Sequence, residues 1–234
     1  RTSMKLGLSW GLAAAFLVIV LGHAQGLYVA KDKPMKLAAM EAHWETEQPA
    51  AFSVVAIIDE SAKKNRVSLD IPYVLGILAY NSPFAEVRGI NDLQKEAEKS
   101  YGPGNYIPPV TIVYWSFRLM VGIGTLLLLA LGLAWWLDRK NRLVEQKKLL
   151  RFLFWLLPLP YIANIAGWTV AEVGRQPWIV FGLQKVDKAF SPVVTTGHLF
   201  FSLSGYILIY TFLTFVWIYL MKKNARLNPD EEVA

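Results

Sequence analysis

Four long runs with almost no charged side chains constrain the fold of this chain more than any other feature. They cover residues 6–27, 110–137, 152–170 and 193–220. A helix needs about 20 apolar residues to cross the hydrocarbon core of a bilayer, and each run is long enough. The chain is 54% hydrophobic, which argues against a water-soluble globular protein. The sequence therefore predicts an all-α integral membrane protein with four transmembrane helices.

The first run has an alternative interpretation as a signal peptide, because Arg1 and Lys5 precede an apolar stretch that closes near residues 22–25. However, no charge occurs from Leu6 through Ala30, and no clear small-residue cleavage pattern follows. These features favour a retained helix.

The distribution of Lys and Arg predicts the orientation, since short cytoplasmic connections carry the excess of positive charge. One set of connections holds Arg1, Lys5, Arg139, Lys140, Arg142, Lys147, Lys148, Arg151, Lys222, Lys223 and Arg226, and the opposite short connection holds Arg175, Lys185 and Lys188. The first set is therefore expected to be cytoplasmic. The predicted organisation is a transmembrane helix over 1–30, an extracytoplasmic segment over 31–109, three transmembrane helices over 110–221 and a cytoplasmic tail over 222–234.

Several functional classes lack support in this sequence. The same cytoplasmic cations account for the net charge of +6, so the basic balance does not require a nucleic-acid partner. The chain has no cysteine, which excludes disulfides and cysteine-bound iron–sulfur clusters within it. A Gly-rich phosphate loop, a His-x-x-x-His pair and a nucleophile elbow are also missing from the sequence, so hydrolase and nucleotide-binding functions are not indicated.

The polar segment 31–109 mixes short elements and has no pattern of a large core of its own. Residues 36–44 are rich in helix formers, 66–80 combine β-branched and aromatic residues, and 92–99 predict a short charged helix. Residues 101–105 predict a turn. We expect this segment to lie against the membrane helices, because so small a segment buries too little surface to fold alone.

Charged residues within or beside the apolar runs are the strongest functional signal. Insertion of an ionisable residue into a membrane costs roughly 2.5–3.5 kcal/mol, so such a residue persists mainly where a partner, a cavity or a cofactor compensates it. Arg118 lies roughly 12 Å into the second run at 1.5 Å per residue. Glu172 and Arg175 lie at the outer end of the third run. All three are expected in one outer layer beneath the polar segment.

The Arg118-Leu119-Met120 sequence is chemically suited to a heme. A planar guanidinium binds propionates bidentately, and a thioether sulfur is a soft axial ligand for heme iron. The alternative for Met120 alone is an ordinary packing residue.

The three histidines stand apart from one another in the sequence. His23 and His198 lie near the outer ends of the first and fourth runs, and His43 lies in the polar segment. Each is interpreted as an interfacial histidine held by hydrogen bonds, with binding of protons, quinone or metal as the alternative.

Three motifs in order, residues 36–41 (KLAAME), 117–120 (FRLM) and 167–178 (GWTVAEVGRQPW), resemble subunit I of the cytochrome bd quinol oxidases. The resemblance extends over essentially the whole chain, from the sixth membrane helix of that subunit through its quinol loop to its ninth helix. It implies four transmembrane helices of a larger helical bundle, with one outer-side quinol loop between the first two. It also implies a multi-pass protein of a bacterial cytoplasmic membrane.

The resemblance implies a role for each matching residue. Met120 corresponds to an axial ligand of the low-spin heme b, and Arg118 to a partner of its propionates. Glu172 corresponds to a ligand or close neighbour of the high-spin heme b, which is paired with heme d. Trp168 and Arg175 correspond to residues beside the hemes. The quinol-loop residues implicated in oxidising quinol correspond to Lys36 and Glu41.

The same resemblance implies partners outside this chain. The histidine ligands of the family lie in an upstream half of the same subunit, so His23, His43 and His198 are not assigned to iron. Further expected partners are subunit II, possible small accessory subunits, quinol, oxygen and membrane lipid. The quinol loop lacks the long insertion of one branch of the family, which indicates the short-loop type. Histidine stands at positions 23 and 198 near places where some relatives carry an acid.

Two other functions explain part of this pattern. A transporter or channel bundle would place Arg118, Glu172 and His198 along a polar pathway, but it does not explain the order of the motifs. A non-catalytic heme-carrying membrane anchor would explain Met120 without oxygen reduction. The sequence therefore favours part of a quinol:oxygen oxidoreductase that generates proton-motive force.

Overall fold

A computed structural model describes residues 2–191 and 193–224 of the chain. It contains two compact units, residues 1–188 and 189–234, which are described separately. Four helical segments are long and apolar enough to cross a membrane: Ser3–Asp32, Val110–Arg139, Lys147–Val173 and Thr196–Asn224. These segments confirm the mostly helical fold with four candidate membrane helices.

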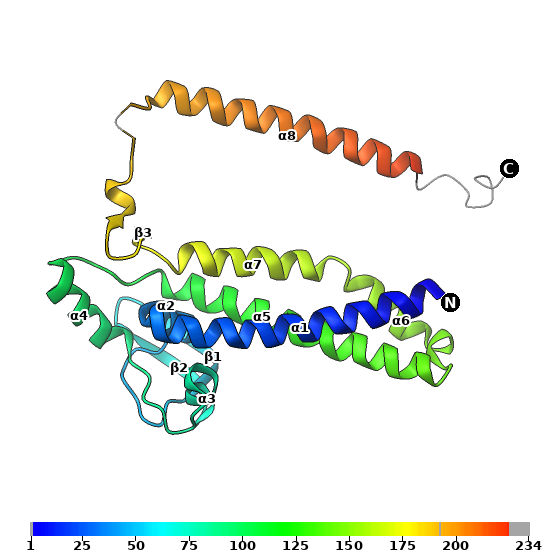
Figure 1. Cartoon of the computed structure of the whole chain (residues 1–234), viewed down its shortest axis with the longest axis horizontal. Helices are drawn as coiled ribbons and strands as arrows, with labels where there is room; N and C mark the ends of the chain where they lie inside the picture. The colour runs from blue at the N-terminus through cyan, green and yellow to red at the C-terminus, as the bar shows by residue number, and fades with distance from the viewer. Residues whose placement is uncertain (1, 192, 225–234) are drawn as a thin grey trace. The chain divides into compact units, whose positions relative to one another are not determined.

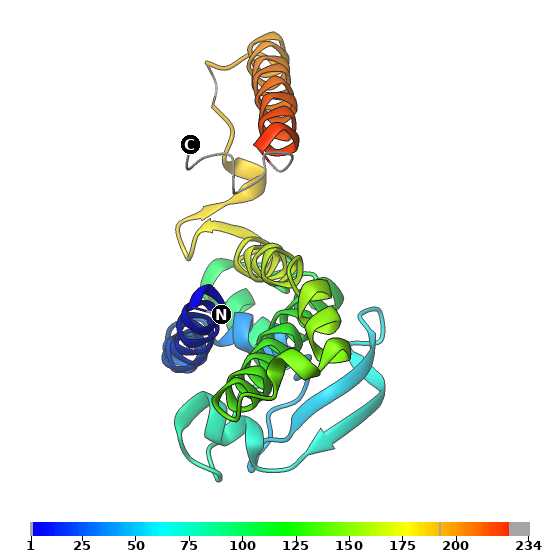
Figure 2. The ribbon, with the colours of Figure 1, turned by 90° about the vertical axis from the view of Figure 1, so that its right-hand side faces the viewer.

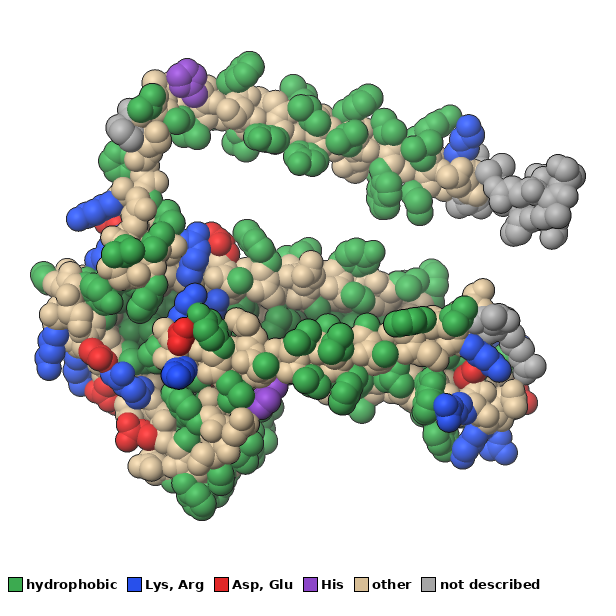
Figure 3. All heavy atoms as spheres, viewed as in Figure 1, with side chains coloured by type: hydrophobic (Ala, Val, Ile, Leu, Met, Phe, Trp, Pro, Cys, Tyr) green, Lys and Arg blue, Asp and Glu red, His purple; other side chains and the backbone are tan. Residues whose placement is uncertain are grey.

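The first unit is built around three of these segments. Helix α1 covers Thr2–Asp32, α5 covers Val110–Arg139 and α7 covers Leu159–Val173. Helix α5 packs against both α1 and α7 (Figures 1 and 2). Charged side chains of this unit gather towards the two ends of these helices, and the length between them carries mainly hydrophobic side chains (Figure 3). This distribution matches helices that cross a bilayer.

The third predicted helix is two helices in the structure. Helix α6 covers Lys147–Trp155 and ends before a short turn that leads into α7. Pro158 precedes the first residue of α7 and Pro160 lies in its first turn. Proline lacks the backbone donor that a continuous helix needs, but it fits the first turn of a new helix. A short 3-10 turn, η1 (Leu143–Glu145), connects α5 to α6.

The polar segment folds into helices and one hairpin. Helix α2 covers Pro34–Glu41, strands β1 (Phe52–Asp59) and β2 (Lys64–Ile71) pair antiparallel, and α3 (Val74–Tyr80) and α4 (Ile90–Tyr101) follow. The helix expected over 36–44 thus begins and ends earlier. It ends because Ala42 adopts a left-handed conformation, φ 49°, and its N–H returns to the carbonyls of Ala38 and Ala39.

One buried core joins the polar segment to the membrane helices. Val110, Val113 and Tyr114 of α5 are fully buried and belong to the same cluster as Ala38 and Ala39 of α2. Small side chains on α2 allow its backbone to approach α5 closely. The polar segment therefore lies against the membrane helices, in agreement with the expectation from its composition.

A short hairpin follows α7 and ends the first unit. It consists of β3 (Trp178–Val180) and β4 (Gln184–Lys185), and a 3-10 turn η2 (Val186–Lys188) follows it. The second unit contains α8, Thr196–Asn224, which has no buried residue among those described. The cytoplasmic tail is expected over 222–234; residues 222–224 belong to α8 in the structure, and residues 225–234 lie outside the described part of the chain.

Candidate functional site

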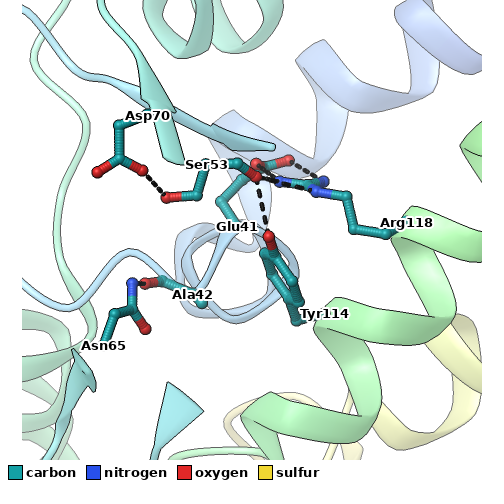
Figure 4. Close-up of polar contacts among 7 residues, drawn as sticks. All are labelled: Glu41, Ala42, Ser53, Asn65, Asp70, Tyr114 and Arg118. Carbon is teal, nitrogen blue, oxygen red and sulfur yellow. Dashed lines mark hydrogen bonds and ion pairs between the residues drawn. The ribbon is translucent and has the colours of Figure 1, made fainter. Parts of the chain in front are cut away.

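Arg118 of α5 and Glu41 of α2 form a buried ion pair. Arg118 Nη2 lies 2.6 Å from Glu41 Oε2, and the two side chains are 11% and 4% exposed. Arg118 also donates to the backbone carbonyl of Ser53 in β1, from Nε at 3.0 Å and from Nη2 at 2.6 Å (Figure 4). Burial raises the pKa of the Glu41 carboxyl, and the Arg118 charge opposes this rise. One guanidinium thus ties together α5, α2 and β1.

Aromatic rings surround this guanidinium. Its central carbon lies 4.4 Å from the ring centroid of Phe52 and 4.6 Å from that of Tyr114. The hydroxyl of Tyr114 donates to the Ser53 carbonyl at 3.0 Å. Cation–π contacts of this kind stabilise a desolvated cation. The charge of Arg118, expected to face heme propionates, is compensated here by protein groups.

The β1–β2 hairpin is tied to the end of α2 by a second set of hydrogen bonds. Asn65 donates to the carbonyl of Ala42 at 3.0 Å and accepts a hydrogen bond from Trp44 Nε1 at 3.0 Å. Asp70 accepts a hydrogen bond from the hydroxyl of Ser53 (Figure 4) and another from the hydroxyl of Ser68. These contacts fix the Ser53 carbonyl that binds Arg118.

Lys36 of α2 reaches the end of α7 rather than Glu41. Its Nζ donates to the carbonyl of Ala171 at 3.3 Å, and its stem crosses Gly174. Burial lowers the pKa of Lys36, and the neighbouring charge of Lys33 acts in the same direction. The ammonium therefore gives up a proton more readily than an exposed lysine does.

A pocket of about 310 Å³ opens beside Lys36. Its walls come from α2, from α4, from residues flanking these helices and from the segment after α7. The basic and aromatic lining residues are Lys33, Lys36, Arg88, Arg175, Tyr101, Tyr106, Trp178 and Phe181. Asp32 and Glu96 also line the pocket, and Glu96 is paired with Arg88. Tyr106 stacks on Trp178 with ring centroids 5.7 Å apart. The pocket thus combines flat apolar surfaces with cationic hydrogen-bond donors.

Glu172 and Arg175 form an ion pair one turn apart at the end of α7. Arg175 Nη1 also donates to the carbonyl of Trp178 at 2.7 Å. Arg175 lines the pocket beside Lys36, whereas Glu172 does not. The ion pair fixes the guanidinium at the rim of the pocket.

Met120 of α5 is partly buried against α7. A side chain at Gly167 would place its Cβ 2.9 Å from the Met120 sulfur, so α5 and α7 approach closely there. Trp168, the next residue of α7, is 66% exposed. The thioether of Met120 is a suitable soft donor for heme iron, and the Glu172 carboxylate supplies an oxygen donor. Within the described residues, no group of three or more His, Cys, Asp or Glu side chains forms a metal site.

The expected site residues form separate local groups. Lys36 and Arg175 meet at the pocket, Glu41 meets Arg118, and Met120 meets Gly167. Ser53 was not predicted as a site residue, because it contributes through its backbone carbonyl and therefore leaves no side-chain signal. The packing roles of Gly167 and Gly174 were not predicted either, although their spacing of seven residues within one motif indicates one helix face.

The three histidines have different surroundings. His43 is buried, and its Nε2–H donates to the carbonyl of Val87 at 3.1 Å. His23 Nε2 lies 3.0 Å from Asn81 Oδ1, and the side chain of His198 is exposed. His43 and His23 thus have the hydrogen-bonded structural environment that their positions indicated.

Comparisons with known proteins identify the family. The family described as "Cytochrome bd terminal oxidase subunit I" matches residues 1–229. The chain is 40% identical to cytochrome bd ubiquinol oxidase subunit 1 of Bacillus subtilis, over 100% of this chain and 51% of that protein. It is 33% identical to cytochrome bd-II ubiquinol oxidase subunit 1 of Escherichia coli, over 97% of this chain and 55% of that protein.

A solved structure supports the same assignment. The bd oxidase from Geobacillus thermodenitrificans aligns with a TM-score of 0.79 and 32% identity, covering 98% of this chain and 50% of that chain. The chain therefore spans about half the length of the relatives that it matches. The motifs, the four candidate membrane helices and these matches agree, and the chain belongs to the cytochrome bd terminal oxidase subunit I family.

Proposed function

We propose that this chain forms part of a cytochrome bd-type quinol oxidase in a bacterial cytoplasmic membrane. The enzyme oxidises quinol at the outer face and reduces oxygen to water. It releases protons outside and takes protons from inside, which generates proton-motive force without pumping. The observation that carries this proposal is the pocket beside Lys36, built by α2 and by the α7 motif in a chain of this family.

The pocket is the proposed binding place of the quinol ring. Its volume of about 310 Å³ lies at the lower end of the range for ligand pockets, roughly 300–1,000 Å³, and suits a headgroup whose apolar tail remains outside. Aromatic walls such as Tyr106 and Trp178 stack against a planar ring, and Lys36 and Arg175 donate hydrogen bonds to its oxygens. Lys36, with its lowered pKa, exchanges protons with a quinol hydroxyl.

Glu41 has a more indirect role in this proposal. It lies on α2 five residues after Lys36, roughly 7.5 Å along the helix at 1.5 Å per residue, and does not line the pocket. Its raised pKa suits a carboxylate that accepts a proton after the first acceptor. Arg118 holds this carboxylate in place and balances its charge when it is ionised.

Heme sites are proposed on the other side chains. Met120 would be an axial ligand of the low-spin heme b, and Glu172 would bind or adjoin the high-spin heme b near heme d. When bound, the hemes supply electron transfer from quinol to oxygen. Trp168 is exposed on α7 and is free to contact a heme face, and Arg175 would lie beside the hemes. Arg118 would form an ion pair with heme propionates only while it also remains paired with Glu41.

The complete enzyme requires chains and segments beyond these residues. We propose that the other half of subunit I supplies the histidine ligands, and that subunit II and possible small accessory subunits complete the complex. The segment between α1 and α5 is proposed to be a quinol loop of the short type on the extracytoplasmic side.

Substitution of the proposed iron ligand tests the heme assignment. Met120→Leu in the intact complex should abolish or strongly shift the absorption band of the reduced low-spin heme while the protein still accumulates. Met4→Leu on α1 is the matched control and should leave the band unchanged, because Met4 is exposed outside the proposed site. An unaltered spectrum of Met120→Leu would remove the ligand assignment.

Substitutions in α2 test the quinol site independently. Lys36→Ala and Glu41→Ala should impair quinol oxidation while the heme spectrum is retained. Lys64→Ala, on an exposed part of β2, should not. Normal turnover of both variants at saturating and limiting quinol would contradict the proposed site.

A further inference from the structure

One face of α7 carries glycine at two positions where side chains from other elements pass close to the backbone. A Cβ at Gly167 would lie 2.9 Å from the sulfur of Met120 on α5. A Cβ at Gly174, which follows the last turn, would lie 2.5 Å from the carbonyl oxygen of Val170, and 3.2 Å from Cε and 3.4 Å from Cγ of Lys36 on α2. Both glycines therefore leave room for a side chain of a different element.

The two glycines lie on the inward face of α7. They are seven residues apart, which is about two turns at 3.6 residues per turn. Ala166 and Val170 of the same helix are buried, whereas Ile165 and Trp168 are strongly exposed. The glycines thus continue the buried stripe of the helix, and this face is directed towards α5 and α2.

Backbone conformation does not account for glycine at these positions. Gly167 is inside α7, where glycine lowers helix stability relative to alanine. Gly174 has φ −70° and ψ −7°, which any residue adopts. At Gly167 the close approach of Met120 is the remaining reason, since contacts below 3.0 Å force a shift. At Gly174 a Cβ would meet both the carbonyl oxygen of Val170 at 2.5 Å and the stem of Lys36 at 3.2 Å, so the space beside the glycine is filled from its own helix end and from α2.

We propose that Gly167 and Gly174 are positioning residues that set the places of the Met120 thioether and the Lys36 side chain. This inference rests on the proposed function, because it assigns both crossing side chains to the same enzyme. Gly167 holds open the space that the thioether of Met120 occupies between α5 and α7. Gly174 lets the stem of Lys36 cross the end of α7 so that its ammonium reaches Ala171 and the pocket.

The first experiment measures the Gly167–Met120 contact in the intact complex by thermal unfolding. Gly167→Ala should lower the melting midpoint by several degrees, and the same change in a Met120→Ala background should lower it much less. Gly124→Ala on α5 is the matched control, since nothing lies within 4 Å of its Cβ position, and should not lower the midpoint. If Gly167→Ala behaves like Gly124→Ala, the positioning role is wrong.

Failure to assemble also decides the question. If the Gly167→Ala complex does not assemble but adding Met120→Ala restores its assembly, the contact is supported, because truncation of Met120 removes the clash. If the double variant also fails to assemble, the harm caused by alanine at position 167 does not come from a clash with Met120, and the inference is overturned.

The reduced low-spin heme band separates this inference from the proposed function. We expect Gly167→Ala to shift the band in the same direction as Met120→Leu, to a smaller extent. If Met120→Leu changes the band while Gly167→Ala alters neither band nor melting, the proposed function stands and the positioning role fails. If the thermal coupling is present but neither variant changes the band, the positioning role stands and the ligand assignment fails.

Quinol kinetics test the second glycine. Gly174→Ala should raise the KM for quinol by several fold, mainly through displacement of Lys36, with kcat less affected. In a Lys36→Ala background, Gly174→Ala should have little further effect on KM. An unchanged KM, or an equal increase in both backgrounds, would contradict the positioning of Lys36.

Discussion

Arg118 and Glu41, 77 residues apart in the chain, form the buried ion pair that joins a membrane helix to the polar segment. The Ser53 carbonyl, held by Tyr114 and Arg118, adds the β1–β2 hairpin to the same junction. A buried charge of this kind is tolerated only while its partner is present, because an unpaired charge in the interior is strongly destabilising. The pair therefore determines how the polar segment is placed on α5.

Removal of one member of this pair should destabilise the complex strongly. Arg118→Ala leaves the Glu41 carboxylate buried without its partner, and loss of one partner from a buried pair costs about 3–5 kcal/mol. Replacement of both residues by apolar ones, Glu41→Leu with Arg118→Met, should cost less. The measurement is thermal unfolding of the complex together with protease sensitivity of residues 31–109.

The exposed pair between Arg66 and Asp59 provides the control. Arg66 is 69% exposed, so Arg66→Ala should change unfolding little. If Arg118→Ala is no more harmful than Arg66→Ala, the buried pair does not hold the polar segment in place.

His43 should make the polar segment less stable under mildly acidic conditions. Burial lowers the pKa of His43 below its ordinary value of 6.5, while the charges of Glu47, Asp70 and Glu45 and the bond to Val87 partly oppose this. As the pH falls below 6.5, the unfolded segment binds a proton before the folded one does. Folding stability therefore falls with pH in the window between the ordinary and the folded pKa.

A variant with a neutral donor tests this pH dependence. His43→Gln should flatten the loss of stability below pH 6.5, as measured by protease resistance of residues 31–109 across pH 5–8. His198→Gln, at an exposed position, is the control and should retain the pH dependence of the parent. An acid-induced loss that persists unchanged in His43→Gln would exclude this histidine as its source.

The sequence predicted the membrane helices because their signal is local. Length and low charge are sufficient to identify α1, α5 and α8, even with Arg118 inside α5, and only the break at Pro158 between α6 and α7 was missed. A window that averages hydropathy combines two helices when the proline turn between them is itself apolar. The short elements of the polar segment were less well bounded, as Ala42 shows, because a left-handed cap by alanine has no sequence signature.

The partners of the site residues were less predictable than their identity. The position of a charge within an apolar run identified Arg118 as a candidate site residue. Only the fold shows that Glu41 and a backbone carbonyl compensate this charge. Likewise, Lys36 and Glu41 share α2, yet they reach different partners because helix geometry directs them to different sides. Tertiary pairing over such separations depends on packing and is not encoded in a short motif.

Single introduced cysteines should establish on which side of the membrane each connection lies, as predicted from the distribution of positive charges. The chain contains no cysteine, so each introduced thiol is the sole one in this sequence. Lys148→Cys, in α6, should react with a membrane-impermeant maleimide only from the cytoplasmic side, and Lys63→Cys, in the β1–β2 turn, only from the outer side. Both positions are exposed, so each provides the other's accessibility control. Labelling of both from one side would overturn the predicted topology.

Gly89 should be essential for the attachment of α4, because two backbone segments meet there without space for a side chain. A Cβ at Gly89 would lie 2.3 Å from the carbonyl carbon of Glu45 and 2.5 Å from the carbonyl oxygen of Trp44. The adjacent amides of Ile90 and Asn91 donate to the carbonyls of His43 and Trp44, so the segments cannot separate without loss of these bonds.

We therefore expect Gly89→Ala to destabilise the polar segment by about 1–3 kcal/mol, the usual cost of overpacking. Since α4 forms one wall of the pocket, the same change should weaken the quinol binding proposed there. Gly104→Ala is the matched control, because its nearest neighbour is the flexible end of Lys185 at 3.4 Å. Thermal unfolding and limited proteolysis of both variants provide the measurement. Equal stability of Gly89→Ala and Gly104→Ala would show that the backbone contact at Gly89 does not hold α4 in place.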